Sequence, residues 1–441
     1  MHLTLPIDVL RQKLAESLHQ PSRALTQRDI TLPAIPGKVL AVIGVRRGGK
    51  TSFMRRHAQD QVVSGRPPES QLLLSLEDER LSRLSVSDLA WMVEEHGRQF
   101  SALLEPGARS LYLDEVHLVP GWETYVRRLV DEGAMREIFV SGSSAKLLSR
   151  EVATSLRGRA LEVLVHPFSF RETLRHSATE PTSPWGSLSP RGHTTLDAAL
   201  TRYLEHGGFP EAQGATPRDR NSLLQSYVDS MLLRDVIERF SVTNTPALMW
   251  LARALLTAPG GRFTITKFRD TLRSHGVPVA KETLEAYLDH LDDAFLVRTI
   301  AMKATSERQR MVNPRKAYPI DPALISLYTR LGRTYRGASL ETVVLLELER
   351  RGYETTWVKV GANREVDFLA EQSGEPPLLV QVSLDVSDDE TWEREVRALE
   401  EAAVYHSGAR AILVTGTSAP PTRHMPPGVE WRSAADWLLT D

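Results

Sequence analysis

The most constraining feature of this chain is a short apolar segment that runs directly into a glycine-rich loop. Residues 39–43 read Val-Leu-Ala-Val-Ile, and residues 44–51 read Gly-Val-Arg-Arg-Gly-Gly-Lys-Thr. An unbroken apolar run of this length is typical of a buried parallel strand, and the G-x-x-x-x-G-K-T pattern after it is typical of a phosphate-binding loop. A helix expected over 50–60 adds the positive end of its dipole. The sequence therefore predicts that the chain binds ATP or GTP.

The individual positions of this loop have distinct predicted roles. The glycines let the backbone turn its N–H groups toward the phosphates, and Lys50 adds a positive charge near the β- and γ-phosphates. The Thr51 hydroxyl is placed to hold Mg²⁺. The predicted nucleotide-binding residues are Gly44, Val45, Arg46, Arg47, Gly48, Gly49, Lys50, Thr51 and Ser52.

A second motif follows 64 residues after Lys50, where the apolar segment 110–113 ends in Asp114 and Glu115. In a Walker B element, Asp114 holds Mg²⁺ and Glu115 orients and deprotonates the attacking water. An acidic pair at a strand end is also common as a solvated edge, but its pairing with the phosphate loop favours the hydrolytic role.

A third apolar strand, expected over 137–141, ends in a run of serines and glycine. In AAA+ ATPases a polar side chain at this point senses the γ-phosphate, which makes Ser141 or Ser143 the sensor candidate. The alternative is a helix N-cap, because Ser144 precedes the apolar-rich residues 145–148, and both roles are compatible.

The composition excludes several other classes of site. The 441-residue chain has no cysteine, which rules out disulfides, cysteine-ligated zinc and thiol nucleophiles. A formal net charge of −2 means that any affinity for nucleic acid has to come from a local patch. No segment resembles a signal peptide or reaches membrane-spanning length, so we expect a cytoplasmic protein without membrane contacts.

Strands and helices alternate from residue 40 to about 172, which predicts an α/β fold with a parallel sheet and helices on both faces. We expect further strands over 71–75 and 110–114, and further helices over 86–98, 122–132 and 144–150. The predicted domains are a nucleotide-binding domain over 1–175, a helical, lid-like region over 195–245, a winged helix over 246–318 and a mixed α/β domain over 319–441.

The predicted winged helix has helices over 267–274, capped by Thr266, and 280–293, followed by strands over 295–302 and about 310–318. Its second helix has five acidic side chains against Lys281, so phosphates repel it. The following hairpin is basic, and we predict that any DNA contact is made to the backbone by this hairpin. A solvated basic hairpin is an equally open alternative. The candidate residues are Lys303, Arg308, Arg310, Arg315 and Lys316.

Several ordered motifs together resemble one family, the prokaryotic AAA+ P-loop ATPases that have a winged helix and a restriction-endonuclease-like domain at the C-terminus. The resemblance covers nearly the whole chain. Besides the three motifs above, it rests on Leu156-Arg-Gly-Arg159, Pro167-Phe-Ser-Phe170, Gly207-Gly-Phe-Pro210, Lys316-Ala-Tyr-Pro-Ile-Asp321 and Arg364-Glu-Val-Asp-Phe368.

This resemblance implies an ATPase that uses Mg²⁺ and works as a homo-oligomeric ring, such as the hexamers that other AAA+ proteins form. In such rings an arginine of one subunit reaches the γ-phosphate held by the next. Arg157 and Arg159 are the candidates for that role, and Arg234 is a weaker candidate acting within its own subunit. Surface ion pairing is the alternative for each.

The C-terminal domain departs from the nuclease pattern. Glu341 and Asp367 fit the first two acidic, metal-binding positions, but the E-x-K motif is replaced by Gln381 and Ser383. We therefore predict a degenerate, non-cleaving domain that is retained for binding or assembly. The alternative is that Lys359 has taken over the role of the missing E-x-K lysine.

These observations leave three functions open. The leading hypothesis is an ATP-driven ring motor that remodels or translocates on duplex or branched DNA, as in repair or recombination. The alternative is a nucleotide-operated switch or scaffold that engages a protein partner through the acidic helix. An ATP-dependent nuclease is disfavoured by the missing E-x-K motif.

Overall fold

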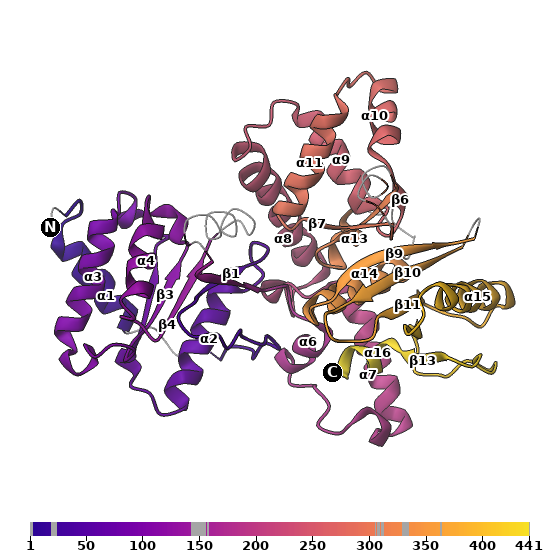
Figure 1. Cartoon of the computed structure of the whole chain (residues 1–441), viewed down its shortest axis with the longest axis horizontal. Coiled ribbons are helices and arrows are strands. Elements are labelled where there is room, and N and C mark those ends of the chain that lie inside the picture. The colour runs from indigo at the N-terminus through magenta and orange to yellow at the C-terminus, as the bar shows by residue number, and fades with distance from the viewer. Residues whose placement is uncertain are drawn as a thin grey trace. The chain divides into compact units, whose positions relative to one another are not determined.

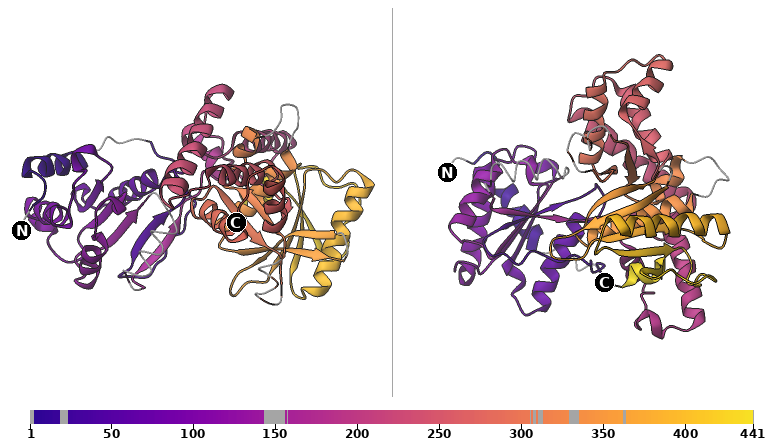
Figure 2. Two further views of the ribbon diagram at one scale, coloured as in Figure 1. Left: turned by 90° about the horizontal axis from the view of Figure 1, so that it is seen from above. Right: turned by 45° about the vertical axis from the view of Figure 1, so that its right-hand side comes forward.

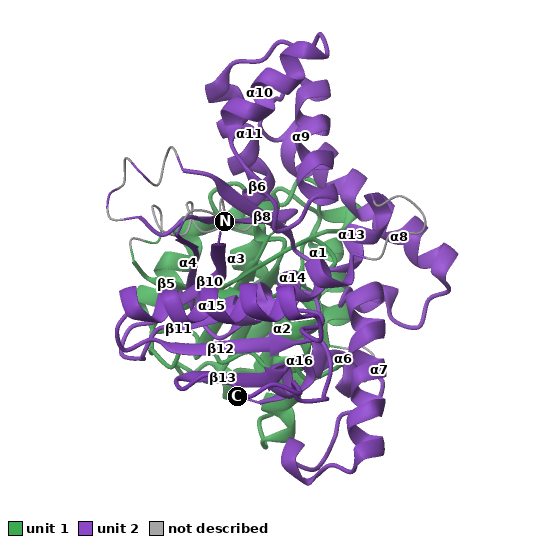
Figure 3. Cartoon of the chain, turned by 90° about the vertical axis from the view of Figure 1, so that its right-hand side faces the viewer, with its two compact units in different colours: residues 1–166 green, residues 167–441 purple. Residues whose placement is uncertain are grey.

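The computed structural model describes residues 3–18, 24–142, 156, 158–304, 306, 309, 313–328, 335–361 and 364–440. They form two compact units, residues 1–166 (unit 1) and 167–441 (unit 2), coloured separately in Figure 3.

Unit 1 is built on a five-stranded sheet in the order β2-β3-β4-β1-β5, in which every neighbouring pair is parallel. Residues of β1, β2, β3 and β4 are almost all buried, as expected for continuous apolar runs between two layers of helices. The strands are β1 Val39–Ile43, β2 Gln71–Ser75, β3 Ser110–Asp114, β4 Glu137–Ser141 and β5 Ala160–Leu164.

Helices cover both faces of this sheet, with α2 on the side opposite to α3 and α4 (Figures 1 and 2). The observed helices are α1 Ile7–Leu18, α2 Lys50–Val63, α3 Val86–Gln99 and α4 Trp122–Asp131. These bounds confirm the expected helices within a few residues. The sequence reading missed α1 and the edge strand β5, and the helix expected over 144–150 lies outside the described residues.

Unit 2 contains a mixed five-stranded sheet in the order β13-β12-β11-β10-β9. β10 is antiparallel to β9 and β11, whereas β11, β12 and β13 are parallel to one another. Its strands are β9 Glu354–Val360, β10 Arg364–Glu371, β11 Leu378–Ser383, β12 Arg410–Thr415 and β13 Val429–Ser433. The sequence pattern predicts strands over 354–360, 365–370, 378–384 and 411–415, but not β13.

The two faces of this mixed sheet carry separate hydrophobic cores. One core joins the sheet to α14 (Arg336–Arg350), and the other joins it to α15 (Asp389–Tyr405). The α14 core also takes in side chains of α6 (Phe170–His176), α7 (Pro190–His206) and α16 (Ala434–Leu439). The first part of unit 2 therefore shares a core with the mixed sheet. The Pro/Ser/Gly-rich composition of residues 176–195 predicts an exposed loop, whereas α7 already begins at Pro190.

The winged-helix region lies between these parts and has helices α9 (Thr245–Thr257), α10 (Ile265–Ser274) and α11 (Lys281–Asp293). Its three-stranded sheet has the order β6-β8-β7, with strands β6 Arg262–Phe263, β7 Val297–Ala301 and β8 Arg315–Pro319.

One cap in this region differs from the prediction. The N-cap of α10 is Thr264, whose hydroxyl accepts a hydrogen bond from the backbone N–H of Lys267, and Thr266 lies inside the helix. The predicted α/β architecture is confirmed: a parallel sheet covered by helices comes first, a helical region with a three-stranded sheet follows, and a mixed α/β sheet comes last. The domain boundaries within unit 2 stay a prediction.

Candidate active site

The glycine-rich loop between β1 and α2 has the backbone geometry that its sequence demands. Gly44 has a φ of 141° and Gly49 a φ of 102°, both in a region that other residues avoid. A Cβ atom at Gly44 would lie 2.1 Å from the carbonyl oxygen of Val165, so only glycine fits there. The loop is therefore fixed by close backbone approach on one side.

Lys50 and Thr51 are the first two residues of α2, and both side chains form hydrogen bonds. Lys50 is 7% exposed, and its ammonium donates to the carbonyl oxygens of Gly44 at 3.0 Å and Val45 at 3.1 Å. The Thr51 hydroxyl donates to Asp114 Oδ2 at 2.8 Å. The two predicted Walker motifs thus meet in one place at the ends of β1 and β3.

Ser141 completes this network from β4, the strand that lies between β1 and β3. Its buried hydroxyl donates to Asp114 Oδ1 and accepts a hydrogen bond from the backbone N–H of Glu115 at 3.1 Å. This is the position at which a sensor was predicted, and the sensing role itself stays a prediction. The other candidate, Ser143, lies outside the described residues.

Glu115 has a left-handed backbone conformation, with a φ of 58°. Burial raises the pKa of its carboxyl group to about 7, with Asp114 adding to the shift and Lys50 opposing it. Its Oε2 lies 3.3 Å from Nδ1 of His117. A carboxyl group poised near neutral pH suits a group that accepts a proton from water.

Two residues of this site were missed by the sequence reading. His117 follows Glu115 by two positions, a proximity that was visible in the sequence. Arg28 carried no such signal: its guanidinium donates to the carbonyl oxygens of Gly48 at 3.2 Å and His166 at 2.5 Å. Arg28 therefore connects the phosphate loop with the segment that follows β5. The two acceptor residues, Gly48 and His166, are more than a hundred positions apart in the chain.

The oxygen atoms gathered here fit a magnesium ion. Mg²⁺ prefers hydroxyl, carboxylate and phosphate oxygens, and Thr51 and Asp114 present a hydroxyl and a carboxylate side by side. When bound with a nucleotide, the ion would neutralise charge on the phosphates.

The three arginine candidates have different positions. Arg159 donates from Nε to Asp131 Oδ1 at 2.7 Å, with 36% of its side chain exposed. Arg157 lies outside the described residues, and Arg234 is exposed in the π-helix Met231–Glu238 of unit 2. None of the three roles is tested by this geometry.

The predicted DNA-contacting residues need one correction. Lys316 is 1% exposed and is surrounded by carboxylates, so it is not part of a basic surface. A count of charges along the chain missed this, because the acidic partners of Lys316 lie on α14 and β10, far from β8 in the sequence. Burial alone would lower its pKa, but Asp367, Glu341 and Glu365 outweigh that effect and raise the pKa.

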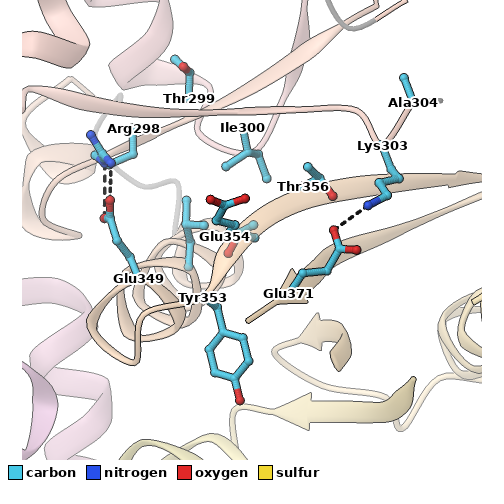
Figure 4. A pocket seen from close by; sticks show the side chains of 12 residues that line it. Arg298, Thr299, Ile300, Lys303, Ala304, Glu349, Tyr353, Glu354, Thr356 and Glu371 are labelled. Atoms are coloured by element: carbon cyan, nitrogen blue, oxygen red, sulfur yellow. Dashed lines mark hydrogen bonds and ion pairs between the residues drawn. The ribbon is translucent and has the colours of Figure 1, made fainter. Parts of the chain in front are cut away.

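The remaining basic residues proposed for DNA contact differ in their burial and in their ion pairs. Lys303 borders a cavity of about 520 Å³ and donates to Glu371 Oε2 at 2.5 Å, as Figure 4 shows. In the same cavity Arg298 pairs with Glu349. Arg315 is half-buried, and Arg308 and Arg310 lie outside the described residues.

The acidic positions of the nuclease-like domain are brought together, but around a lysine. Lys316 Nζ lies 3.1 Å from Asp367 Oδ1 and 3.3 Å from Glu341 Oε1. Among the described residues, no group of three acidic or histidine side chains is arranged to hold a metal ion. The residues present therefore do not fit the metal that the nuclease fold implies. Lys359, the lysine considered for the missing role, is exposed on β9.

No helix in the described part of the chain is both long and apolar enough to span a membrane.

Comparison with protein-family models divides the chain into three parts. Residues 36–174 match an AAA domain, residues 197–334 match a domain of unknown function, and residues 333–421 match a restriction endonuclease domain. The first match contains all five strands of the P-loop sheet, and the third contains α14 and strands β9 to β12 of the mixed sheet.

Similar whole proteins are also found. The uncharacterized protein MJ1544 of Methanocaldococcus jannaschii is 31% identical over 379 residues, covering 85% of this chain and 81% of the relative. An uncharacterized protein of Haemophilus influenzae is 27% identical, covering 91% of this chain and 94% of the relative. Among solved structures, the Walker-type ATPase of Pyrococcus abyssi is 17% identical, with 73% of this chain and 94% of that chain covered and a TM-score of 0.39.

Proposed function

The chain belongs to the same family as the Methanocaldococcus jannaschii relative and combines an AAA domain with a restriction-endonuclease-like domain, and from this we propose that it is a Mg²⁺-dependent ATPase whose oligomer acts on DNA. Hydrolysis belongs to unit 1. The action on DNA is assigned to unit 2.

The network of Thr51, Asp114, Ser141 and Glu115 is the observation that carries the proposal. Thr51 and Asp114 would hold the magnesium ion. Lys50, now hydrogen-bonded to loop carbonyls, supplies the positive charge for the β- and γ-phosphates. Glu115 accepts the proton of the attacking water, and its carboxylate is oriented by His117.

Ser141 fixes this arrangement from a third strand. Its hydroxyl bridges the side chain of Asp114 and the backbone of Glu115, so a change at the γ-phosphate that moves Ser141 also moves both acidic residues. This coupling supports a role for Ser141 as the sensor of the nucleotide state.

Action on DNA rests on the charge distribution of unit 2. The helix α11 keeps Glu282 and Asp289 exposed to solvent, which disfavours contact between this helix and phosphates. The positive charge lies in the hairpin between β7 and β8. Because Lys316 is buried, the remaining candidates for DNA contact are Lys303, Arg308, Arg310 and Arg315. Contacts of this kind bind the DNA backbone without reading bases.

The switch or scaffold remains the second candidate, because unit 2 also exposes apolar side chains. Met249 and Trp250 on α9 are 41% and 43% exposed. Neighbouring apolar residues on a surface often mark a site for a protein partner.

The ATPase rate with no DNA and with linear, single-stranded and four-way-junction DNA tests the proposal. We expect hydrolysis that requires Mg²⁺, is lost in Glu115→Gln and is accelerated by at least one DNA. If the protein hydrolyses ATP but no DNA accelerates the reaction, and if it shows no salt-dependent DNA binding, the switch or scaffold would be favoured. Absence of hydrolysis in the presence of every DNA would overturn the ATPase assignment.

A further inference from the structure

The most unusual feature of unit 2 is a lysine buried among three carboxylates. Lys316 lies on β8 and is 1% exposed. Its Nζ lies 3.1 Å from Asp367 Oδ1, 3.1 Å from Glu365 Oε1 and 3.3 Å from Glu341 Oε1. One ammonium group thus bridges two residues of β10 and one residue of α14.

Two of these acids occupy positions that hold metal in restriction-endonuclease-like domains, and both are already engaged. Asp367 Oδ1 accepts from Lys316, and Asp367 Oδ2 accepts from the backbone N–H of Val382 at 3.1 Å. Glu341 Oε1 accepts from Lys316 and from the Tyr318 hydroxyl at 2.5 Å. Lys316 and Tyr318 belong to the same strand, so β8 supplies both of the donors to this glutamate.

The residues at the E-x-K positions, Gln381 and Ser383, also form hydrogen bonds within the domain. Gln381 is 4% exposed, accepts from the backbone N–H of Asp367 at 3.2 Å and donates to Glu395 Oε2 at 2.6 Å. The hydroxyl of Ser383 donates to the carbonyl oxygen of Asp385 at 2.9 Å. Neither position offers a metal ligand with a negative charge or a lysine.

We propose that the ammonium group of Lys316 takes the place of the divalent metal ion in this restriction-endonuclease-like domain. A cluster of buried carboxylates needs a compensating cation, and a cation that belongs to the chain satisfies this need without metal. Because Lys316 comes from β8, the same contact attaches the three-stranded sheet to the five-stranded sheet.

The position of Lys316 also bears on cleavage. A lysine that assists phosphodiester hydrolysis has to reach the water or the phosphate at the metal. Lys316 is enclosed by Glu341, Glu365 and Asp367 and has almost no exposed surface. The alternative, in which Lys316 is a relocated catalytic lysine, requires it to leave this enclosure, and the experiment below separates the two.

Thermal unfolding of the full chain, without nucleotide, in EDTA and in MnCl₂ tests the proposal. We expect Mn²⁺ to leave the wild-type midpoint almost unchanged. Lys316→Met keeps the length of the side chain but removes its charge, and we expect a midpoint about 5–10 °C lower in EDTA because three carboxylates lose their cation. Mn²⁺ should restore much of that loss, since the ion can now occupy the place of the ammonium group.

Three further variants sharpen this experiment. Lys316→Met combined with Asp367→Asn should lose the rescue by Mn²⁺. Lys316→Arg keeps the positive charge and should stay insensitive to Mn²⁺. Lys303→Met is the matched control, because it removes a partly exposed lysine paired with Glu371 and leaves the buried cluster intact. Its midpoint should change little and should not respond to Mn²⁺.

Several results would overturn the proposal. One is a Mn²⁺-dependent rise of the wild-type midpoint that Asp367→Asn abolishes, and another is a folded Lys316→Met variant without any response to metal. If Lys316→Met does not fold, titration of the wild type with Mn²⁺, followed by the paramagnetic signal of the free ion, decides the question, because a site lost in Asp367→Asn would contradict the proposal. Mg²⁺-dependent DNA cleavage by the wild type that Lys316→Met abolishes would identify the lysine as catalytic instead.

Discussion

Thr51 and Asp114 are joined by a hydrogen bond of 2.8 Å between the threonine Oγ1 and the aspartate Oδ2, although 63 positions separate them in the chain. The contact exists because β1 and β3 are parallel strands of one sheet, and parallel strands end at the same edge. It places a hydroxyl and a carboxylate where a magnesium ion and a nucleotide phosphate would meet.

The two motifs joined by this contact serve different steps, so their variants should fail differently. Lys50→Ala removes the charge that attracts the phosphates, and we expect loss of ATP binding. Glu115→Gln keeps the shape of the side chain but cannot accept a proton, and we expect ATP binding with turnover reduced about 100-fold or more. A fluorescent ATP analogue measures binding, and phosphate release measures turnover. Equal turnover by wild type and Glu115→Gln would refute the assignment of Glu115.

Arg159 offers a test of subunit cooperation, because its partner Asp131 provides a matched control. If Arg159 completes the site of a neighbouring subunit, Arg159→Ala should bind ATP but lose hydrolysis. Asp131→Ala breaks the same ion pair and should keep hydrolysis, since the arginine remains.

Mixed oligomers extend that prediction. Arg159→Ala subunits supply an intact Glu115, and Glu115→Gln subunits supply an intact Arg159, so mixing them should restore part of the activity. Oligomers shown to be mixed that still lack activity would indicate that Arg159 has a structural role.

Gly207 should be irreplaceable because of Asp321. A Cβ atom at Gly207, where φ is 71°, would lie 1.8 Å from Asp321 Oδ1. Asp321 is buried and accepts hydrogen bonds from the backbone N–H groups of Gly208 at 2.6 Å and Ala323 at 2.9 Å. We expect Gly207→Ala to lower the unfolding free energy through both backbone strain and this collision.

Gly214 is the control for a positive φ without a collision, since its φ is 73° but a Cβ atom there would meet nothing within 4 Å. Gly214→Ala should lower the free energy of unfolding by roughly 1–2 kcal/mol, the cost of the left-handed conformation alone. Gly207→Ala should exceed it by about 1–3 kcal/mol or more, because Gly207 has a ψ of −173°, in a backbone region that essentially only glycine adopts, and because of the collision. Denaturant titration of both variants measures the difference, and equal losses would show that the contact with Asp321 adds nothing.

DNA binding, if the hairpin mediates it, should depend on the hairpin cations and hardly on α11. Removing the charges of Arg308, Arg310 and Arg315 should weaken binding to all sequences alike, and each lost phosphate contact should reduce the salt slope by roughly one unit. Neutralising Glu282, Glu285 and Asp289 on α11 should leave affinity unchanged or raise it. Binding across a salt series checks both variants, and an unchanged slope in the hairpin variant would argue for the switch or scaffold.

The sequence alone determined the P-loop unit and much of the mixed sheet. Buried parallel strands are continuous apolar runs, and a phosphate loop needs glycines and a lysine at fixed spacing. Both can therefore be recognised within a short stretch of sequence. The acidic pair at the end of β3 and the missing E-x-K motif could be recognised for the same reason. The edge strand β5 was missed because only one of its five residues is fully buried, and the pattern is correspondingly weak.

Only the tertiary structure decided what the individual charges do. By sequence, Lys316 is one of several basic residues in a hairpin, whereas in the fold it is enclosed by acids that lie 25 and 51 positions farther along the chain. Arg28 reaches Gly48 over 20 positions and His166 over 138, and Asp321 reaches Gly208 over 113. A residue type gives the sign of a charge, but its partners depend on which strands and helices are packed together, and this information is absent from any local stretch of sequence.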